Sequence, residues 1–167
     1  MNPAGRWKRG MDFSAISGRR VLITGGLGFI GSNLALRCVS LGCQVTLLTR
    51  SLQKEANVAS MKDRLRVELV DMSTEDSVVS TLYTLLPRQD YVFHLAAQTS
   101  HVQSMDSPLQ DLRANCGVTL ALLEGCREMC PEAAVVMPGT VTQVGRATRL
   151  PVAEDQPDWP LTLYDAH

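Results

Sequence analysis

Short apolar segments alternate along the chain with longer segments whose apolar residues recur at helical spacing. The apolar segments predict five strands, at 19–24, 44–49, 65–70, 90–95 and 133–137. Strands that alternate with helices of this length indicate a parallel sheet that is covered on both faces. The predicted fold is therefore a Rossmann-type doubly wound α/β domain over residues 18–167, with residues 1–17 as a mobile leader.

The intervening segments carry recognisable helix signals. Helices are expected at 28–41, where Gly42 marks the end, weakly at 52–62, from a cap at Ser73 to Pro87, and from Ser107-Pro108 onward. The last of these helices is predicted from apolar residues at helical spacing, namely Leu109, Leu112, Cys116, Leu120 and Leu123.

Composition narrows the classes of partner. The 167 residues suffice for one domain, with 45% apolar and 20% charged residues. A formal net charge of −1 gives no reason to expect nucleic acid or an anionic membrane as partner. No apolar run reaches the roughly 18 residues of a membrane span, and no secretory signal is evident, so we expect a cytoplasmic protein.

The cysteines and histidines do not suggest a metal site. The five cysteines are odd in number and form no C-x-x-C pair, and most fall within apolar helix or strand patterns. We therefore expect reduced, mostly buried thiols and no bound metal. His101 and His167 lie in polar surroundings and share no metal-ligand spacing.

A glycine motif follows the first predicted strand. Gly25, Gly28 and Gly31 are spaced three residues apart between a strand and a helix, with a second strand soon after. Gly25 can adopt the positive φ of a tight turn, Gly28 leaves room for a pyrophosphate, and Gly31 lets the helix approach the strand. This context predicts a dinucleotide site at the helix N-terminus.

The end of the second strand bears on which dinucleotide binds. An acidic residue usually holds the ribose 2′-hydroxyl of NAD at this point, but the strand ends in Thr49-Arg50-Ser51. Arg50, with Ser51 beside it, offers donors suited to a 2′-phosphate, which favours NADP over the alternative, NAD. Arg50 can also be read as a solvated arginine at a strand end.

Asp71 follows the third strand and has two equally plausible roles. Its carboxylate is suited to accept a hydrogen bond from the adenine amino group. It is equally suited to a turn that precedes the Ser73 cap. Both roles stay open at this point.

Three features together carry a family resemblance. The sequence Thr-Gly-Gly-x-Gly-Phe-Ile-Gly at 24–31, His-Leu-Ala-Ala at 94–97 and Asn115 in the long helix resemble the extended short-chain dehydrogenase/reductases, in particular their nucleotide-sugar epimerase/dehydratase branch. The resemblance covers about residues 19–167. It implies a cofactor site formed by Gly25, Gly28, Phe29, Ile30, Gly31, Arg50, Ser51, Asp71, Met72, Leu95, Ala96 and Ala97.

The resemblance also implies three candidate catalytic residues. The family places a Ser or Thr after the fifth strand, and the hydroxyl here comes from Thr140. Tyr164 stands 24 residues further on, where the family has a Tyr-x-x-x-Lys motif, and the lysine position lies one residue beyond His167. Asn115 resembles the helix asparagine that helps to order the site. His94 is expected to be a core residue at a strand end.

These residue types fit hydride transfer at a sugar carbon. A hydroxyl becomes a ketone only if a base takes its proton, and a tyrosine near positive charge can serve as that base. Thr140 would hold the hydroxyl near Tyr164. The acid–base pair that follows the Thr in 4,6-dehydratases is replaced here by Val141 and Thr142, so the sequence favours an epimerase or ketoreductase.

The expected partners and alternatives follow from the same resemblance. We expect a nucleotide-sugar substrate and a homodimer in the full-length protein. A chain end inside an expected helix suggests an N-terminal portion that binds dinucleotide weakly and has no measurable turnover. The alternatives are a non-catalytic NADP-binding module or sensor, and a non-sugar reductase on the same scaffold.

Overall fold

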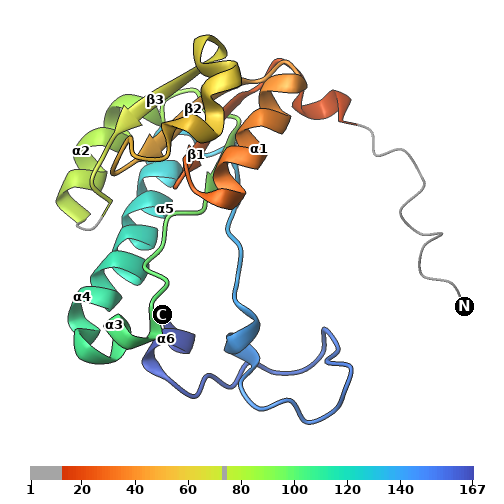
Figure 1. The fold of residues 1–167 in the computed structure, drawn as a ribbon, viewed down its shortest axis with the longest axis vertical. Coiled ribbons are helices and arrows are strands. Elements are labelled where there is room, and N and C mark those ends of the chain that lie inside the picture. Colours follow the sequence, from red (N-terminus) through yellow and green to blue (C-terminus); the bar gives the residue numbers. More distant parts are fainter. Residues whose placement is uncertain (1–12, 73–74) are drawn as a thin grey trace, which may run out of the picture.

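The structure, a computed structural model that describes residues 13–72 and 75–167, is built on a five-stranded parallel sheet (Figure 1). The strand order is β3-β2-β1-β4-β5, which places the first strand at the centre. The strands are β1 (Arg20–Thr24), β2 (Gln44–Thr49), β3 (Leu65–Leu69), β4 (Tyr91–His94) and β5 (Ala134–Val136). From β1 the chain first adds β2 and β3 on one side and then adds β4 and β5 on the other side. The point between β1 and β4, where the chain changes sides, is where doubly wound sheets bind ligands beyond the carboxyl ends of their strands.

Helices cover both faces of the sheet. One face packs against α1 (Phe29–Ser40) and the 3-10 segment η3 (Glu55–Arg64), and the other against α2 (Glu75–Leu85) and α5 (Val118–Met129). The predicted Rossmann-type doubly wound fold is confirmed. None of the described helices is long and apolar enough to cross a membrane.

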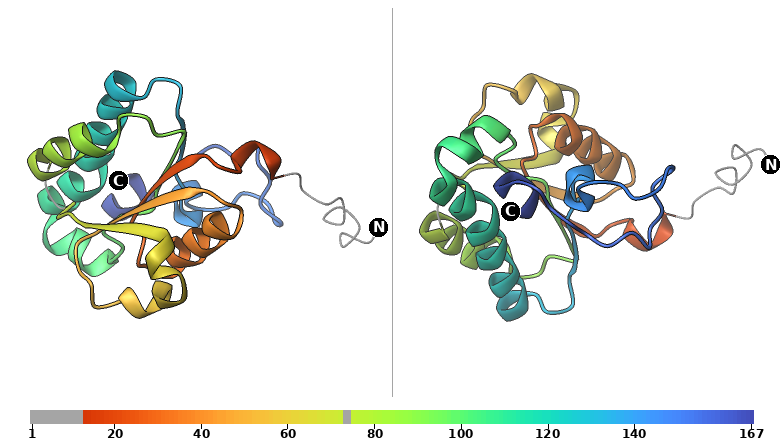
Figure 2. Two further views of the ribbon diagram at one scale, coloured as in Figure 1. Left: turned by 90° about the horizontal axis from the view of Figure 1, so that it is seen from above. Right: turned by 90° about the horizontal axis from the view of Figure 1, so that it is seen from below.

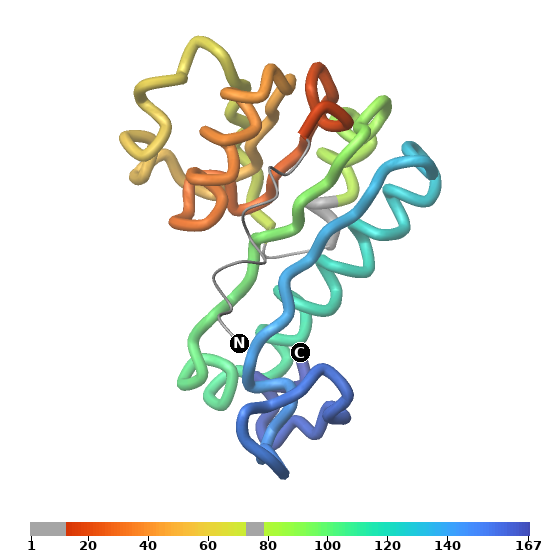
Figure 3. Tube along the Cα trace, turned by 90° about the vertical axis from the view of Figure 1, so that its right-hand side faces the viewer, coloured from red at the N-terminus to blue at the C-terminus, as the bar shows by residue number. Residues whose placement is uncertain are grey.

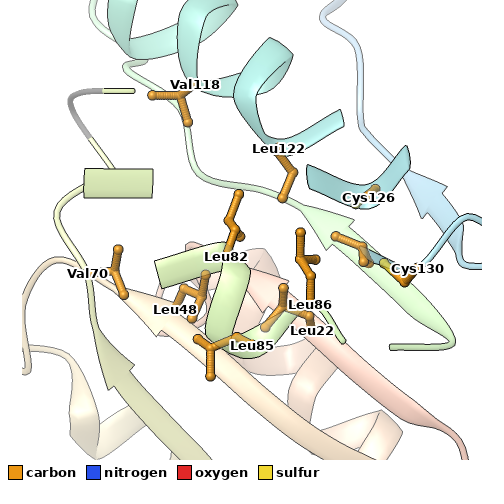
Figure 4. Packing of buried hydrophobic residues seen from close by; sticks show 11 residues of the cluster. Leu22, Leu48, Val70, Leu82, Leu85, Leu86, Val118, Leu122, Cys126 and Cys130 are labelled. Atoms are coloured by element: carbon orange, nitrogen blue, oxygen red, sulfur yellow. The ribbon is translucent and has the colours of Figure 1, made fainter. Parts of the chain in front are cut away.

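Two apolar cores result from the alternation of side chains along the central strands. Val21 and Ile23 of β1 face α1, whereas Leu22 between them faces α2 and α5. Figure 4 shows the second core, in which Leu82 of α2 and Leu86, which directly follows α2, point toward Leu122 of α5. Because both faces of β1 are buried beyond Arg20, its next three residues, 21–23, are apolar, and the strand ends at the buried Thr24.

The observed elements lie close to the predicted ones, with differences at their ends. The second strand has the predicted bounds, and the other strands are shorter by one or two residues. The weak helix expected at 52–62 is a 3-10 segment with a kink at Met61. The predicted cap at Ser73 lies outside the described residues. Four of the five cysteines are buried and all five are free thiols.

The predicted helix from Pro108 is divided into three parts. Ser107 precedes α4 (Pro108–Leu112), a π-helical turn η4 (Arg113–Gly117) follows, and α5 completes the run. The wider π turn inserts a residue and rotates the following side chains by about 100° relative to a continuous α-helix. The residues of α5 that pack on the sheet are therefore Val118, Leu122 and Cys126.

Most of the apolar positions that predict this helix are not the ones that pack against the core. The exposed fractions are 71% for Leu109, 41% for Leu112, 62% for Leu120 and 38% for Leu123. The helix was predicted correctly, but its core-facing side was not. Gly125 contributes to the actual contact because a Cβ there would lie 2.8 Å from Leu86 Cδ1.

Two segments extend beyond the carboxyl ends of the strands. Figures 1 and 3 show the segment with α3 (His101–Asp106) and α4 beside the chain from 140 to 167, which contains η5 (Val141–Val144) and α6 (Leu163–Ala166). Seen from below in Figure 2, α6 lies against the end formed by α3 and α4. Both segments are thus on the side of the sheet where the predicted site lies.

The described part of the predicted leader is short. Residues 14–16 form the 3-10 turn η2 (Ser14–Ile16), and Ile16 packs at the edge of the core formed with α1. Its carbonyl also accepts a hydrogen bond from the Cys43 thiol. Residues 1–12 lie outside the described residues, so the domain boundary at residue 18 stays a prediction.

Gly31 is a position where the packing of α1 against the glycine turn leaves no space for a side chain. A Cβ there would lie 2.4 Å from the carbonyl oxygen of Gly25 and 2.9 Å from Gly26 Cα. We expect Gly31→Ala to lower the free energy of unfolding by about 1–3 kcal/mol, despite the higher helix propensity of alanine. Urea denaturation measures the change. Gly28→Ala is the control and should cost less, because its Cβ would have a single backbone neighbour at 3.1 Å. Equal costs would contradict this packing argument.

Candidate functional site

The glycine turn between β1 and α1 forms the first part of the site. Gly25 has a φ of +64°, and a Cβ there would lie 2.9 Å from the carbonyl oxygen of Leu95. The turn is fixed by hydrogen bonds from the Gly26 amide to the Leu48 carbonyl (3.1 Å) and from the Asn57 side chain to the Leu27 carbonyl (3.0 Å). Gly25 and Gly31 therefore have the structural roles that the sequence predicts.

The N-terminus of α1 is suited to bind an anion. The helix begins after Gly28, and no side chain caps it. Amide groups in an uncapped first turn are available to a ligand, and the helix dipole favours negative charge there. Phe29 and Ile30 in this turn are 83% and 62% exposed. These features fit the pyrophosphate of a dinucleotide.

The end of β4 is joined to the end of β1 by the hydroxyl of Thr24. The amides of Leu95 and Ala96 each donate a hydrogen bond to Thr24 Oγ1, at 3.0 Å in both cases. The same oxygen lies 2.8 Å from Nδ1 of His94. The backbone that leads to Ala97 is thus held directly beside the glycine turn, as the predicted cofactor site requires.

This arrangement also determines the tautomer of His94. A hydroxyl has one proton and two lone pairs, and Thr24 uses both lone pairs for the two amides. It must therefore donate its proton to Nδ1, so the imidazole proton is on Nε2 and is donated to Thr119 Oγ1 at 3.1 Å. Burial lowers the pKa of His94 to about 4, so the ring is neutral at neutral pH. His94 is buried at the strand end, as predicted.

The candidate residues after β2 and β3 lie on the other side of β1 from the loop after β4, because β2 and β4 flank β1 in the sheet. Arg50 is exposed and makes no hydrogen bond or ion pair with the described part of the chain. Ser51 is held by its neighbours: its amide donates to Thr49 Oγ1, and its side chain accepts from the Gln53 amide. Asp71 is exposed, and Met72 packs partly against the core under α2. The structure leaves both roles of Asp71 open.

Asn115 lies in the π turn η4 and binds the backbone after β4. Its Oδ1 accepts a hydrogen bond from the Gln98 amide at 2.8 Å, and its Nδ2 donates to the Gln98 carbonyl at 3.2 Å. A side-chain amide that pairs with both groups of one residue fixes the local path of the chain. Asn115 therefore orders the loop that carries Leu95, Ala96 and Ala97.

Thr140 precedes η5 and caps it. Its Oγ1 accepts a hydrogen bond from the Thr142 amide (3.3 Å) and lies 3.0 Å from Thr142 Oγ1. Gly145 ends η5 with a φ of +58°, and its close approach to the backbone of Trp159 leaves no space for a side chain. The Gln143 carbonyl accepts from the Trp159 amide at 3.0 Å, so the loop after β5 is tied to the segment that leads to α6.

Tyr164 lies in α6, between α3 and η5. Its ring contacts the His101 ring of α3, with the centroids 3.8 Å apart and the planes inclined by 39°. Its neighbour Asp165 interacts with Thr142, and this hydrogen bond lowers the pKa of the carboxyl group. The structure thus connects Thr140, through Thr142 and Asp165, to the helix that carries Tyr164.

Four residues of the site have structural roles that the sequence analysis did not assign. Thr24 joins the ends of β1 and β4, Asn57 holds the glycine turn, and Gln98 and Asp111 bind Asn115. Thr24 could have been noticed as the polar last residue of an apolar strand. Asp111 stands four residues before Asn115 on one helical face. Gln98 and Asn57 carry no comparable signal.

The fold, the glycine turn and the uncapped helix define a dinucleotide-binding Rossmann protein. A family comparison makes this more specific, because residues 21–167 match the model of the NAD dependent epimerase/dehydratase family. The chain belongs to this family.

Curated relatives include epimerases of several nucleotide sugars. The chain is 35% identical over 113 residues to a CDP-paratose 2-epimerase of Salmonella typhi. The matched region covers 65% of this chain and 33% of the relative. The chain is 31% identical over 148 residues to a UDP-glucose 4-epimerase of Mycolicibacterium smegmatis, covering 88% and 47%. The chain thus spans between a third and about half of the length of these relatives.

Solved structures similar to this chain are also epimerases of nucleotide sugars. A UDP-N-acetylglucosamine 4-epimerase from Methanobrevibacter ruminantium superposes with a TM-score of 0.79 and 28% identity, over 90% of this chain and 47% of that one. The Thermus thermophilus UDP-glucose 4-epimerase in complex with NAD has a TM-score of 0.74 and 29% identity, over 88% and 46%. These neighbours support a nicotinamide cofactor and do not distinguish NADP from NAD.

Neutral His94 makes the stability of the fold dependent on pH. The pKa of His94 is about 4 in the folded protein and near 6.5 when the chain unfolds. Between these values the unfolded state binds more protons, so stability should fall by up to about 3 kcal/mol as the pH drops from 6.5 to 4. Urea denaturation at several pH values measures this. His94→Gln should flatten the dependence in this window, whereas His101→Gln should retain it. A dependence unchanged in His94→Gln would contradict the assignment.

Proposed function

We propose that the chain is the N-terminal portion of a nucleotide-sugar epimerase or ketoreductase, with Tyr164 as base and Thr140 orienting the reacting hydroxyl. The observation that carries the proposal is the link between the loop after β5 and α6: Thr140 pairs with Thr142, which interacts with Asp165, the neighbour of Tyr164. The family match supports the reaction class. Relatives include both epimerases and a dTDP-4-dehydro-6-deoxy-D-allose reductase of Streptomyces bikiniensis.

A bound nicotinamide dinucleotide would supply the hydride acceptor and donor. The chain's own residues would manage the proton and the geometry. Thr140 would hold the sugar hydroxyl, and Tyr164 would take its proton as the carbonyl forms. Thr140 now pairs with Thr142, so the hydroxyl of Thr140 is already restricted in direction. Asn115 would act by keeping the loop after β4 in place.

The substrate and assembly belong to the same proposal. We propose a nucleotide sugar as substrate, because the relatives are named for CDP-, UDP- and dTDP-sugars. Homodimer formation also stays a proposal. The exposed leucines of α4 and α5, Leu109, Leu112, Leu120 and Leu123, provide apolar surface for it.

Tyr164→Phe tests the catalytic assignment. In the protein encoded by the whole reading frame, loss of the phenolic hydroxyl should lower kcat by about 10²–10⁴-fold, the usual contribution of a general base. Product analysis by mass spectrometry and NMR identifies an epimer or a reduced ketone. Tyr83→Phe, at an exposed tyrosine of α2, is the matched control and should keep its activity.

Three results would each contradict one part of the proposal. Undiminished turnover in Tyr164→Phe would remove Tyr164 from the reaction. Dinucleotide binding without turnover of any nucleotide sugar by the whole protein would favour a binding module. A 4-keto-6-deoxy product would contradict the interpretation of Val141 and Thr142.

Arg50 is proposed to favour NADP over NAD. Its exposed guanidinium lies at the end of β2, where its donors suit a 2′-phosphate. Arg50→Ala should weaken NADP binding about tenfold or more and leave NAD binding nearly unchanged, because a hydrogen bond to a charged group contributes about 1.5–3 kcal/mol. Titration calorimetry with both cofactors measures this. Lys54→Ala removes a charge of the same sign nearby as the control. Equal affinity of the unaltered chain for NAD and NADP would contradict the proposal.

A further inference from the structure

Asp111 of α4 is a buried carboxylate that no candidate role in the reaction explains. Its side chain is fully buried, and it is the only buried acidic residue among those whose burial is described, 13–72 and 79–167. Burial of a charged group is costly unless hydrogen bonds replace its water. The contacts of Asp111 therefore show what the residue does.

Four side chains donate to Asp111, and each comes from a different segment. Oδ1 accepts from Gln98 Nε2 at 2.7 Å and from Asn115 Nδ2 at 3.4 Å. Oδ2 accepts from Ser104 Oγ at 3.1 Å and from His167 Nδ1 at 3.0 Å. A carboxylate has about four lone-pair sites and no donor, so the histidine nitrogen must be the donor. Each oxygen of Asp111 is thus used twice.

These donors connect the segments that hold the proposed base. His167 follows Tyr164 by three residues, and its amide donates to the Leu163 carbonyl at 3.0 Å. Ser104 belongs to α3, which also contributes His101, the ring that contacts Tyr164. The helix that carries Tyr164 is therefore bound to Asp111 directly, through His167, and indirectly, through α3. Figure 1 shows this helix, α6, beside α3 and α4.

The other oxygen acts on the loop beside the proposed cofactor site. Asn115 and Gln98 both donate to Oδ1, while Asn115 also binds the amide and carbonyl of Gln98. One carboxylate thus fixes the orientation of the Asn115 side chain and the loop after β4. The loop after β4 is thus bound to Oδ1 and the segments around Tyr164 are bound to Oδ2, so one carboxylate holds both parts of the site.

We propose that Asp111 is a positioning residue that sets Tyr164 and Asn115 relative to each other. This inference rests on the proposed function, because Tyr164 is taken as the base. Asp111 touches neither substrate nor cofactor and acts through His167, Ser104 and Asn115. Loss of its charge should loosen both halves of the site while the sheet stays folded.

Asp111→Asn tests the proposal with little change in shape. The amide nitrogen is a donor, so it must face one of the two pairs of donors that now meet a carboxylate oxygen. In the chain with ¹³C-labelled tyrosine rings, the Tyr164 signal is assigned by its absence in Tyr164→Phe. We expect it to move toward its position in His101→Ala, as the contact with His101 opens. The signals of Tyr83 and Tyr91 should stay in place.

Kinetics provide a readout that a purely structural role would not change. In the protein of the whole reading frame, kcat should fall by about 10²-fold, the loss typical of a displacement near 1 Å, with a much smaller change in KM. Asp155→Asn, at an exposed aspartate that pairs with Arg149, is the control and should match the unaltered protein. If Asp111→Asn does not fold, Ser104→Ala removes only the link to α3 and should shift the Tyr164 signal by a smaller amount.

The outcomes separate the two proposals. An unmoved Tyr164 signal and an unchanged kcat in a folded Asp111→Asn would overturn the positioning role, even if Tyr164→Phe is inactive. Full activity of Tyr164→Phe would instead overturn the proposed function. In that case the tyrosine spectrum would still report whether Asp111 holds α6 in place.

Discussion

The hydroxyl of Thr24 is the single group on which the arrangement of the site depends. Thr24 is the last residue of the central strand. Its hydroxyl accepts hydrogen bonds from the amides of Leu95 and Ala96 and donates one to His94. Through these bonds the loop after β4 is held against the glycine turn, where Gly25 has no space for a side chain. The cofactor-binding edge of the sheet is thus organised by one buried threonine between two strands.

The same constraint extends outward in steps. Neutral His94 donates a hydrogen bond to Thr119 at the start of α5. The π turn before α5 places Asn115 where it binds the loop after β4. Asp111 then binds Asn115 on one oxygen and His167 on the other. Two sets of polar contacts, one around Thr24 and one around Asp111, therefore lie between the centre of the sheet and the helix of Tyr164, beside two cores that are almost entirely apolar.

Sequence patterns predicted the positions of the strands and the glycine turn well, because both depend on local residue types. The run Val21-Leu22-Ile23 is typical of a strand that is buried on both faces, and Gly31 is required by its contact with Gly25, six residues away. The core-facing side of α5 was not predictable in this way. It depends on the extra residue of the π turn, which changes the phase of Leu120 and Leu123 without altering their spacing. Gln98 was missed because only the tertiary fold brings its partners together. Asp111 has one local partner, Asn115, but its contact with His167 depends on the tertiary fold.

The separation of Thr24 and His94 along the chain also affects how the protein is made. These neighbours in space are 70 residues apart in sequence. During synthesis the glycine turn, β2 and β3 emerge long before β4, so the central strand at first has a partner on only one side. Non-local pairings of this kind form slowly. Until β4 arrives, one edge of β1 and the hydroxyl of Thr24 are exposed, and the nascent domain has an open sheet edge on which other chains can pair.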